Sequence, residues 1–358
     1  MWCVSKANTF QFTAFHQLTP LAQYGILLVM KMHATALAHP NIAFIKYWGL
    51  EDEARRIPSN GSISMNIGGL ATTTTVAFDS DLKEDTFTLN GDHVTGQGLL
   101  RVQHFMDRIR RLADTTRHAH ITSHNNFPMG AGLASSASGF AALALAGTAA
   151  LGLELTDRQL SSLAHFGSGS ACRSIPGGFV EWLVDPLTGE SYAVSIAPFD
   201  HWKLVDCIAI LSDQHKPVGS EAGMRMAGSS PLQEARVADV DRRLETCRQA
   251  ILNRDFESLA KVTELDSNMM HAVMMTADPP LYYWQPESLA VMSAVKAWQQ
   301  EGFPITFTLD AGPNVHVITT QGVSKEIINR LHRIPGVLAV LTGAPAGAAR
   351  LLPQDSPS

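Results

Sequence analysis

The chain has 358 residues, of which 45% are apolar and 17% charged, so it is long enough for two domains and has the composition of a soluble globular protein. Its formal net charge of −6 gives no reason to expect a nucleic acid or an anionic membrane as partner. The four cysteines are widely spaced and form no C-x-x-C pair, which argues against a zinc site or a disulfide framework and favours a cytoplasmic location.

We expect residues 1–31 to be a disordered N-terminal extension. The apolar run at 24–30 is short, has no basic segment just ahead of it and is followed by no convincing cleavage site, so it does not read as a signal peptide. We divide the remaining chain into an ATP-binding domain over 32–205 and a C-terminal domain over 206–358.

The first of these domains begins with strand-like patterns. Alternation and β-branched residues predict strands at 33–38, 62–67, 72–79, 85–95 and 117–123, the fourth a hairpin that turns at Asn90-Gly91-Asp92. Apolar residues at helical spacing predict a helix over 98–113. The stretch 137–155 is rich in Ala, Gly and Ser, which suits a helix buried in protein, and Thr156 begins a capping box for the next helix.

The second domain mixes both kinds of element. The patterns predict a strand at 203–211, helices at 231–252, 254–274 and 287–301, strands at 304–309 and 314–320, a helix at 323–333 and a strand at 336–342. This mixed order with hairpin strands favours an α+β fold over a doubly wound sheet.

The segment most indicative of chemistry, residues 125–139, follows a predicted strand and opens the Ala-rich helix. Its glycines let the backbone approach a ligand closely, and the first turn of a helix presents unpaired N–H groups at the positive end of its dipole. Ser135 and Ser136 add hydroxyl donors. These groups suit a polyphosphate, although a structural turn with a serine cap has the same composition. The segment is neither a Walker A loop nor a G-x-G-x-x-G loop.

Three shorter segments each carry one notable charge. Arg173 lies among small hydroxylated residues, which suits a carboxylate or phosphate but also an ordinary surface arginine. Lys46 interrupts the apolar run 41–49, where a lysine that snorkels to solvent is the simpler interpretation. Asp310 ends a predicted strand ahead of a tight turn and, taken alone, reads as a turn former.

Together these segments resemble the GHMP kinase superfamily and, within it, the mevalonate diphosphate decarboxylase group. The motifs are N-I-A-F-I-K-Y-W-G (41–49), N-N-F-P-M-G-A-G-L-A-S-S-A (125–137), G-S-G-S-A-C-R-S (167–174), G-G-F-V-E-W (177–182), D-S-N-M-M-H-A (266–272) and D-A-G-P-N (310–314). The resemblance spans residues 33–345. It implies a two-domain α+β fold with a ribosomal protein S5 domain 2-like N-terminal domain and a ferredoxin-like C-terminal domain.

The resemblance also implies roles for the motifs. Asp310 would receive the C3-hydroxyl proton as the ATP γ-phosphoryl group is transferred, Lys46 would keep Asp310 ionised, and Arg173 would hold the substrate carboxylate. Ser135 would take part in catalysis with them. The ATP phosphates, bridged by Mg²⁺, would lie on Pro128, Gly130, Ala131, Gly132, Leu133, Ala134, Ser135 and Ser136. The implied substrate residues are Tyr47, Trp48, Ser168, Gly169, Ser170, Arg173 and Ser220. No metal ligands are implied.

Two positions depart from the diphosphate-using pattern. Leu50 replaces the second lysine of K-Y-W-G-K, and Glu221 stands where many relatives have an arginine that meets the diphosphate. A charge-assisted contact contributes about 1.5–3 kcal/mol, so losing two weakens diphosphate binding roughly 10²–10⁴-fold unless Arg225 compensates. The V-G-S run at 218–220 is similar to that of phosphomevalonate decarboxylases. We therefore expect 5-phosphomevalonate to be converted to isopentenyl phosphate, ADP, phosphate and CO₂.

Other readings stay open. They are a diphosphomevalonate decarboxylase that forms isopentenyl diphosphate, a mevalonate 3-kinase that stops before decarboxylation, a decarboxylase of a 3,5-bisphosphate, and a non-catalytic binding paralogue. Retention of Asp310 and of the 128–139 loop argues against the last two. The expected partner is a small phosphorylated mevalonate, with no nucleic acid or membrane, and the resemblance implies a homodimer.

Overall fold

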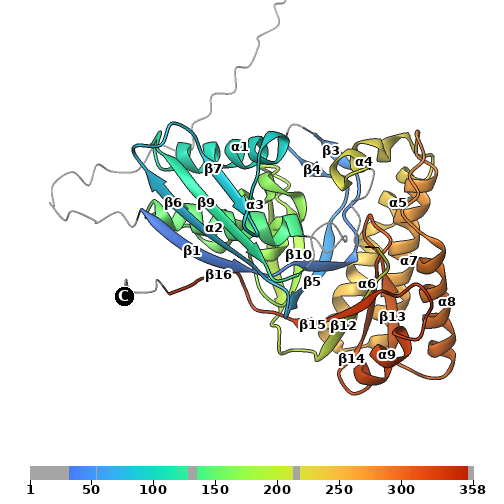
Figure 1. Ribbon diagram of the computed structural model, residues 1–358. Helices are drawn as coiled ribbons and strands as arrows, with labels where there is room; N and C mark the ends of the chain where they lie inside the picture. The colour runs from blue at the N-terminus through green and yellow to red at the C-terminus, as the bar shows by residue number, and fades with distance from the viewer. Residues whose placement is uncertain (1–31, 54, 128–134, 213–217, 354–358) are drawn as a thin grey trace, which may run out of the picture. The chain divides into compact units, whose positions relative to one another are not determined.

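The computed structural model describes residues 32–53, 55–127, 135–212 and 218–353 (Figure 1). These described residues form one compact unit. The predicted extension over 1–31 and the predicted ATP-loop residues 128–134 lie outside the described residues. Within the described part, helices and strands are mixed along the chain, so the α+β class predicted from the sequence is confirmed.

The first sheet belongs to the N-terminal half of the chain. Its strand order is β16 (Arg350–Leu351), β1 (His33–Ala38), β6 (Thr72–Asp79), β9 (His118–Asn125), β7 (Thr86–Leu89) and β8 (Asp92–His93). Buried and less buried residues alternate along β6 and β9, because side chains of a strand point to opposite faces. The buried face packs against α2 (Ser135–Ala150). The other helices of this half are α1 (Gly96–Leu112) and α3 (Asp157–Gly167).

The second sheet joins the two halves of the chain. Its order is β11 (Ser191–Ala197), β10 (Phe179–Val184), β5 (Ser62–Gly68), β15 (Ala339–Pro345), β12 (Leu204–Ile210), β14 (Val315–Thr320) and β13 (Ile305–Thr308), with β2 (Asn41–Ile45) also paired to β5. The pairing of β15 with β5 carries the sheet across the predicted boundary at 205/206. That boundary stays a prediction.

Helices of the C-terminal half lie together on the right of Figure 1. They are α4 (Ser220–Met226), α5 (Gln233–Ala238), α6 (Val240–Asn253), α7 (Phe256–Met275), α8 (Pro286–Gln300) and α9 (Ser324–Leu331). Helix α7 packs against β2 and β13, so it connects a strand from the start of the chain with one near its end. The remaining short elements are β3 (Leu50–Asp52), β4 (Ile57–Pro58), and the 3₁₀ turns η1 (Gly169–Ser174) and η2 (Ala227–Ser229).

One predicted helix is wrong in its extent. The helix expected over 231–252 is two helices, α5 and α6, which meet at Asp239. Asp239 leaves the helical conformation with φ −96° and ψ 1°, and its carboxylate accepts hydrogen bonds from Arg242 and Arg243. Apolar spacing describes which side chains face the core and does not register a change of backbone angles at one polar residue. Strands β2, β10 and β11 were also not predicted.

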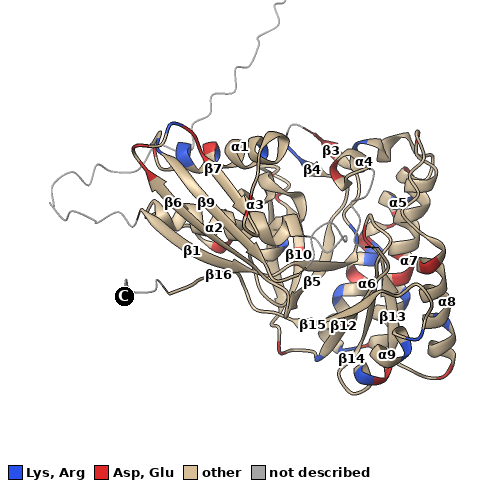
Figure 2. Ribbon diagram, in the orientation of Figure 1, with Lys and Arg blue, Asp and Glu red and all other residues tan. Residues whose placement is uncertain are grey.

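Charged residues of both signs are interspersed over the helices (Figure 2). Among residues 32–353, apart from the gaps given above, none of the helices is both long and apolar enough to cross a bilayer.

Candidate active site

A cavity of about 800 Å³ brings the predicted site residues together. Its walls include Lys46, Tyr47, Trp48, Ser135, Ser136, Ser168, Gly169, Ser170, Arg173, Ser220 and Asp310, which are all of the predicted site residues that the structure describes. Pro128, Gly130, Ala131, Gly132, Leu133 and Ala134 lie outside the described residues. Segments separated by up to 264 positions in sequence thus face one space of the size that small-molecule sites occupy.

An ion pair between Lys46 and Asp310 lies in this wall. Lys46 directly follows β2, Asp310 follows β13, and Lys46 Nζ is 2.7 Å from Asp310 Oδ1. The lysine side chain is 2% exposed and that of Asp310 is 32% exposed. The interpretation of Lys46 as a snorkelling residue is therefore wrong, because its ammonium is buried against a carboxylate that faces the cavity.

Each partner of this pair favours the charged form of the other. Burial raises the pKa of Asp310, but Lys46, then His316 and Arg173, outweigh burial and bring that pKa below its ordinary value. Burial lowers the pKa of Lys46, and Asp310 and then Asp266 oppose that shift. At neutral pH the cavity therefore contains an ionised carboxylate that can accept a proton.

Two of the three guanidinium nitrogens of Arg173 donate hydrogen bonds to protein side chains, and the third does not. Nε donates to Ser64 Oγ at 3.1 Å and Nη2 donates to Asn41 Oδ1 at 3.0 Å. Nη1 is buried and has no hydrogen-bond partner among the described residues. A buried guanidinium nitrogen without a partner is costly, so a cavity-lining Arg173 is suited to an anionic ligand group.

Hydroxyl groups of two segments converge beside Arg173. Ser136 Oγ, at the start of α2, lies 3.3 Å from Ser168 Oγ, which lies 3.5 Å from Ser170 Oγ. Gly169 lets Tyr47 approach, because a Cβ at that position would lie 2.8 Å from the Tyr47 ring. Small residues in the motif therefore make room for the aromatic residue and leave hydroxyl donors facing the cavity.

A group of five charged residues, the outer charge cluster, lines the same cavity. It consists of Glu53, Arg56, Arg101, Glu221 and Arg225. Arg56 Nη2 lies 2.7 Å from Glu221 Oε1, and Arg225 Nε lies 2.7 Å from Glu53 Oε1. Arg225 and Arg101 approach Glu221 at 3.6 and 3.9 Å. Three arginines against two glutamates leave the cluster one positive charge, so Glu221 is not an isolated repulsive anion.

Sequence reasoning missed most of this cluster and the partners of Arg173. Arg56 and Arg101 stood in no motif, and Asn41 was within one without an assigned role. Asn41 at the start of the N-I-A motif and the paired acidic and basic residues at 51–56 were the available signals. Nothing in spacing alone indicated that 56, 101 and 221 would meet.

The donor set also bears on metal binding. The described residues contain no group of three or more His, Cys, Asp or Glu that could hold a metal ion. Mg²⁺ that accompanies a nucleotide needs only one or two protein oxygens beside phosphates and waters. The serine hydroxyls and Asp310 fit that requirement.

Comparisons with known proteins agree with this site. Residues 38–193 match the family model of the diphosphomevalonate decarboxylase-like N-terminal domain, and residues 207–340 match that of the mevalonate 5-diphosphate decarboxylase C-terminal domain. A diphosphomevalonate decarboxylase of Ganoderma lucidum is 38% identical over 320 residues, covering 82% of this chain and 80% of its own. A phosphomevalonate decarboxylase of Haloferax volcanii is 35% identical over 293 residues, covering 81% and 89%.

Solved structures extend the similarity to the whole fold. Mevalonate diphosphate decarboxylase of Staphylococcus aureus has a TM-score of 0.86 and 37% identity, covering 90% of this chain and 98% of its own. MDDEF in complex with MVAPP, AMPPCP and magnesium has a TM-score of 0.84 and 36% identity, covering 90% and 99%. The predicted GHMP kinase-like two-domain fold is thereby confirmed. The chain belongs to the family of diphosphomevalonate and phosphomevalonate decarboxylases, which are ATP-dependent carboxy-lyases.

Proposed function

We propose that this protein phosphorylates the C3 hydroxyl of 5-diphosphomevalonate with ATP and decarboxylates the product to isopentenyl diphosphate. The observation that carries the proposal is the Lys46–Asp310 ion pair beside the buried Arg173 Nη1, which has no hydrogen-bond partner among the described residues. One cavity thus offers a proton acceptor and a carboxylate binder, which are the two groups that the reaction requires.

The chain's own residues account for the reaction sequence. The C3 hydroxyl gives its proton to the Asp310 carboxylate while its oxygen takes the γ-phosphoryl group of ATP, and ADP is released. Phosphate then leaves C3, which acquires positive character next to the Asp310 side of the cavity. The C–C bond to the carboxylate breaks, its electron pair forms the double bond, and CO₂ departs. Arg173 orients the carboxylate before that step.

Ser135 and Ser136 are the described residues at the nucleotide side. Both lie in the first turn of α2 and line the cavity, where hydroxyls and the positive end of the helix dipole favour phosphate. We propose that they and Asp310 face Mg²⁺–ATP, in keeping with the AMPPCP and magnesium present in the MDDEF complex. Mg²⁺ would neutralise charge on the phosphate oxygens.

The diphosphate assignment rests on the outer charge cluster and on the relatives. Leu50 and Glu221 removed two cations from the expected pattern, yet Arg56, Arg101 and Arg225 supply three in the same cavity. Curated relatives from fungi to mammals carry the diphosphomevalonate name. These points favour the diphosphate over the monophosphate expected from the sequence.

A second candidate is 5-phosphomevalonate, and one observation favours it. Glu221 already pairs with Arg56 at 2.7 Å, as Glu53 does with Arg225, so two carboxylates already neutralise two of the arginines that a distal phosphate would need. The relative from Haloferax volcanii carries the phosphomevalonate name. A cytoplasmic homodimer stays a prediction in either case.

The test is incubation with ATP, Mg²⁺ and each of mevalonate, its 5-phosphate and its 5-diphosphate, with ADP and CO₂ followed separately. We expect kcat/KM for the diphosphate to exceed that for the monophosphate by at least about tenfold, which corresponds to one charge-assisted contact. The reverse preference would establish the second candidate. ADP without CO₂ would indicate a mevalonate 3-kinase instead.

A further inference from the structure

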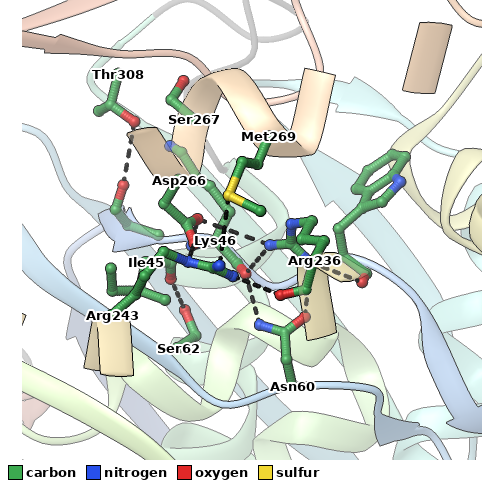
Figure 3. A network of polar contacts seen from close by, with 12 residues as sticks. Ile45, Lys46, Asn60, Ser62, Arg236, Arg243, Asp266, Ser267, Met269 and Thr308 are labelled. Atoms are coloured by element: carbon green, nitrogen blue, oxygen red, sulfur yellow. Dashed lines mark hydrogen bonds and ion pairs between the residues drawn. The ribbon is translucent and has the colours of Figure 1, made fainter. Parts of the chain in front are cut away.

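Behind the cavity wall, a buried group of charged residues surrounds the backbone of Lys46 (Figure 3). Asp266 on α7, Arg236 on α5 and Arg243 on α6 are each at most 1% exposed. None of the three lines the cavity. The reaction described above assigns them no role, although Asp266 begins the D-S-N-M-M-H-A motif.

These side chains hold both polar groups of the Lys46 backbone. Asp266 Oδ1 accepts a hydrogen bond from Lys46 N at 2.6 Å. The Lys46 carbonyl accepts hydrogen bonds from Arg236 Nη2 and from Asn60 Nδ2, both at 2.8 Å. Arg236 Nη1 also donates to Asn60 Oδ1 at 2.9 Å, so the two donors brace each other.

Arg243 completes the group from the far side. Its Nε donates to Asp266 Oδ2 at 2.8 Å, and its Nη2 donates to the carbonyl of Arg236 at 2.8 Å. Arg236 Nη2 is 3.7 Å from Asp266 Oδ1. Three helices of the C-terminal half therefore meet on one residue that follows a strand near the start of the chain.

Stability alone does not explain such a group. Buried ion pairs are weak evidence for stability, because apolar side chains of similar volume often stabilise a fold as well or better. Apolar side chains could not fix the N–H and C=O of Lys46. We propose that the Arg236–Asp266–Arg243 network is a positioning device that holds Lys46 so that its ammonium stays charged and aligned on Asp310.

The charges around Lys46 also support this positioning role. The charged or titratable groups that face Lys46 are Asp310, Asp266, Arg173, Arg236 and His271. After Asp310, Asp266 is the next anion that raises the pKa of Lys46 against burial. Removing the negative charge of Asp266 should therefore weaken the ammonium form of Lys46. This inference rests on the proposed role of Lys46 beside Asp310.

The test compares Asp266→Asn with a matched control, Asp85→Asn. Asp85 is also buried and accepts hydrogen bonds from Nη1 and Nη2 of Arg110 at 2.9 and 3.0 Å, but the backbone N–H that it accepts, at 2.8 Å, belongs to Ala119 and not to Lys46. We expect Asp266→Asn to lower kcat at least tenfold, to leave the KM for ATP within threefold and to move the alkaline limb of kcat to lower pH. Asp85→Asn should lower thermal stability without moving that limb.

Equal losses of kcat in both variants with an unmoved alkaline limb would overturn the proposal. If Asp266→Asn does not fold, Asn60→Ala decides, since it removes one donor to the Lys46 carbonyl, and Arg236 Nη1, which loses its acceptor on Asn60, keeps the carbonyl of Trp48 at 3.4 Å. It should lower kcat at least threefold at unchanged KM, and wild-type kinetics would overturn the proposal.

A measurement without substrate separates this inference from the proposed function. NMR of lysine-labelled protein follows the titration of the Lys46 ammonium, identified by its absence in Lys46→Met. Its midpoint should be lower in Asp266→Asn than in the parent, and an unchanged midpoint would refute the network's role. If the parent turns over no phosphorylated mevalonate, the proposed function fails, yet this titration still decides the inference.

Discussion

Two charged regions, one in and behind the cavity wall and one lining the cavity, differ in how far they are exposed to solvent. The inner charge network, Lys46 with Asp310 in front and Arg236, Asp266 and Arg243 behind, is almost entirely buried, and only Asp310 reaches 32% exposure. In the outer charge cluster, side-chain exposure runs from 28% for Arg56 to 62% for Glu53. Acidic and basic side chains are therefore exposed to water in the outer cluster and buried in the inner network.

Burial decides what each region can do. Removing one partner of a buried pair leaves an uncompensated charge and costs about 3–5 kcal/mol, so the inner network has one arrangement. An exposed pair contributes about 0.2–1 kcal/mol, so a phosphate can draw Arg56 away from Glu221 at little cost. The inner network is therefore suited to holding catalytic groups in a fixed geometry. The outer cluster is suited to binding the part of the substrate that determines specificity.

The sharpest way to break the inner network is Asp310→Asn. The amide keeps the shape but cannot accept the C3-hydroxyl proton, so kcat for both ADP and CO₂ release should fall at least about 10³-fold while ATP still binds. Initial rates and nucleotide titration measure the two effects. Glu257→Gln, at an exposed pair with Lys261, serves as the control. Retention of kcat within tenfold would contradict the assigned role.

Arg173→Gln should have the next largest effect. Glutamine cannot present the buried Nη1 to a carboxylate, and one lost charge-assisted contact should raise the substrate KM by about 10- to 100-fold. CO₂ release should slow more than ADP release. Steady-state kinetics compares this variant with Arg158→Gln, an exposed arginine paired with Asp185 and Glu190. Equal slowing of both products would rule out a carboxylate-specific role.

The pH profile tests Lys46 itself. Because burial lowers the pKa of Lys46, kcat should decline on the alkaline side below the ordinary lysine value of about 10.4. On the acid side the relevant group is Asp310, whose pKa in the folded protein is lowered. Its contribution to the stability of the fold is present above the pKa of the unfolded state and is lost as the pH falls through the pKa of the folded state. Lys46→Arg should retain about a tenth of kcat and move the alkaline limb upward, since a guanidinium stays charged. An unmoved limb would mean that another group titrates.

The smallest effect should come from the outer cluster. Glu221→Gln releases Arg56 for a ligand, so KM for the diphosphate should fall about two- to fivefold, with thermal stability nearly unchanged. Kinetics at low and high salt provide the check, because screening should reduce the difference between variant and parent. A rise in KM would mean that Glu221 holds Arg56 in its binding position.

Individual elements show how far sequence reasoning reached. The strand predicted at 72–79 is β6, Thr72–Asp79, because its alternating pattern is local. The capping box at Thr156 is present with its hydrogen bond from Gln159 N to the threonine hydroxyl. The helix predicted over 231–252 was wrong in its extent, since the break at Asp239 is a local change of backbone angles that apolar spacing does not encode.

The family and the α+β class could be inferred without a structure, because ordered motifs and local periodicity are properties of neighbouring residues, and the same motifs predicted Lys46, Arg173 and Asp310 as site residues. The contacts that these residues make depend on tertiary packing. Lys46 meets Asp310 across 264 positions and Asp266 across 220, and Arg56 meets Glu221 across 165. Burial and long-range pairing set the charge state of each group, and both arise only when distant segments pack against one another.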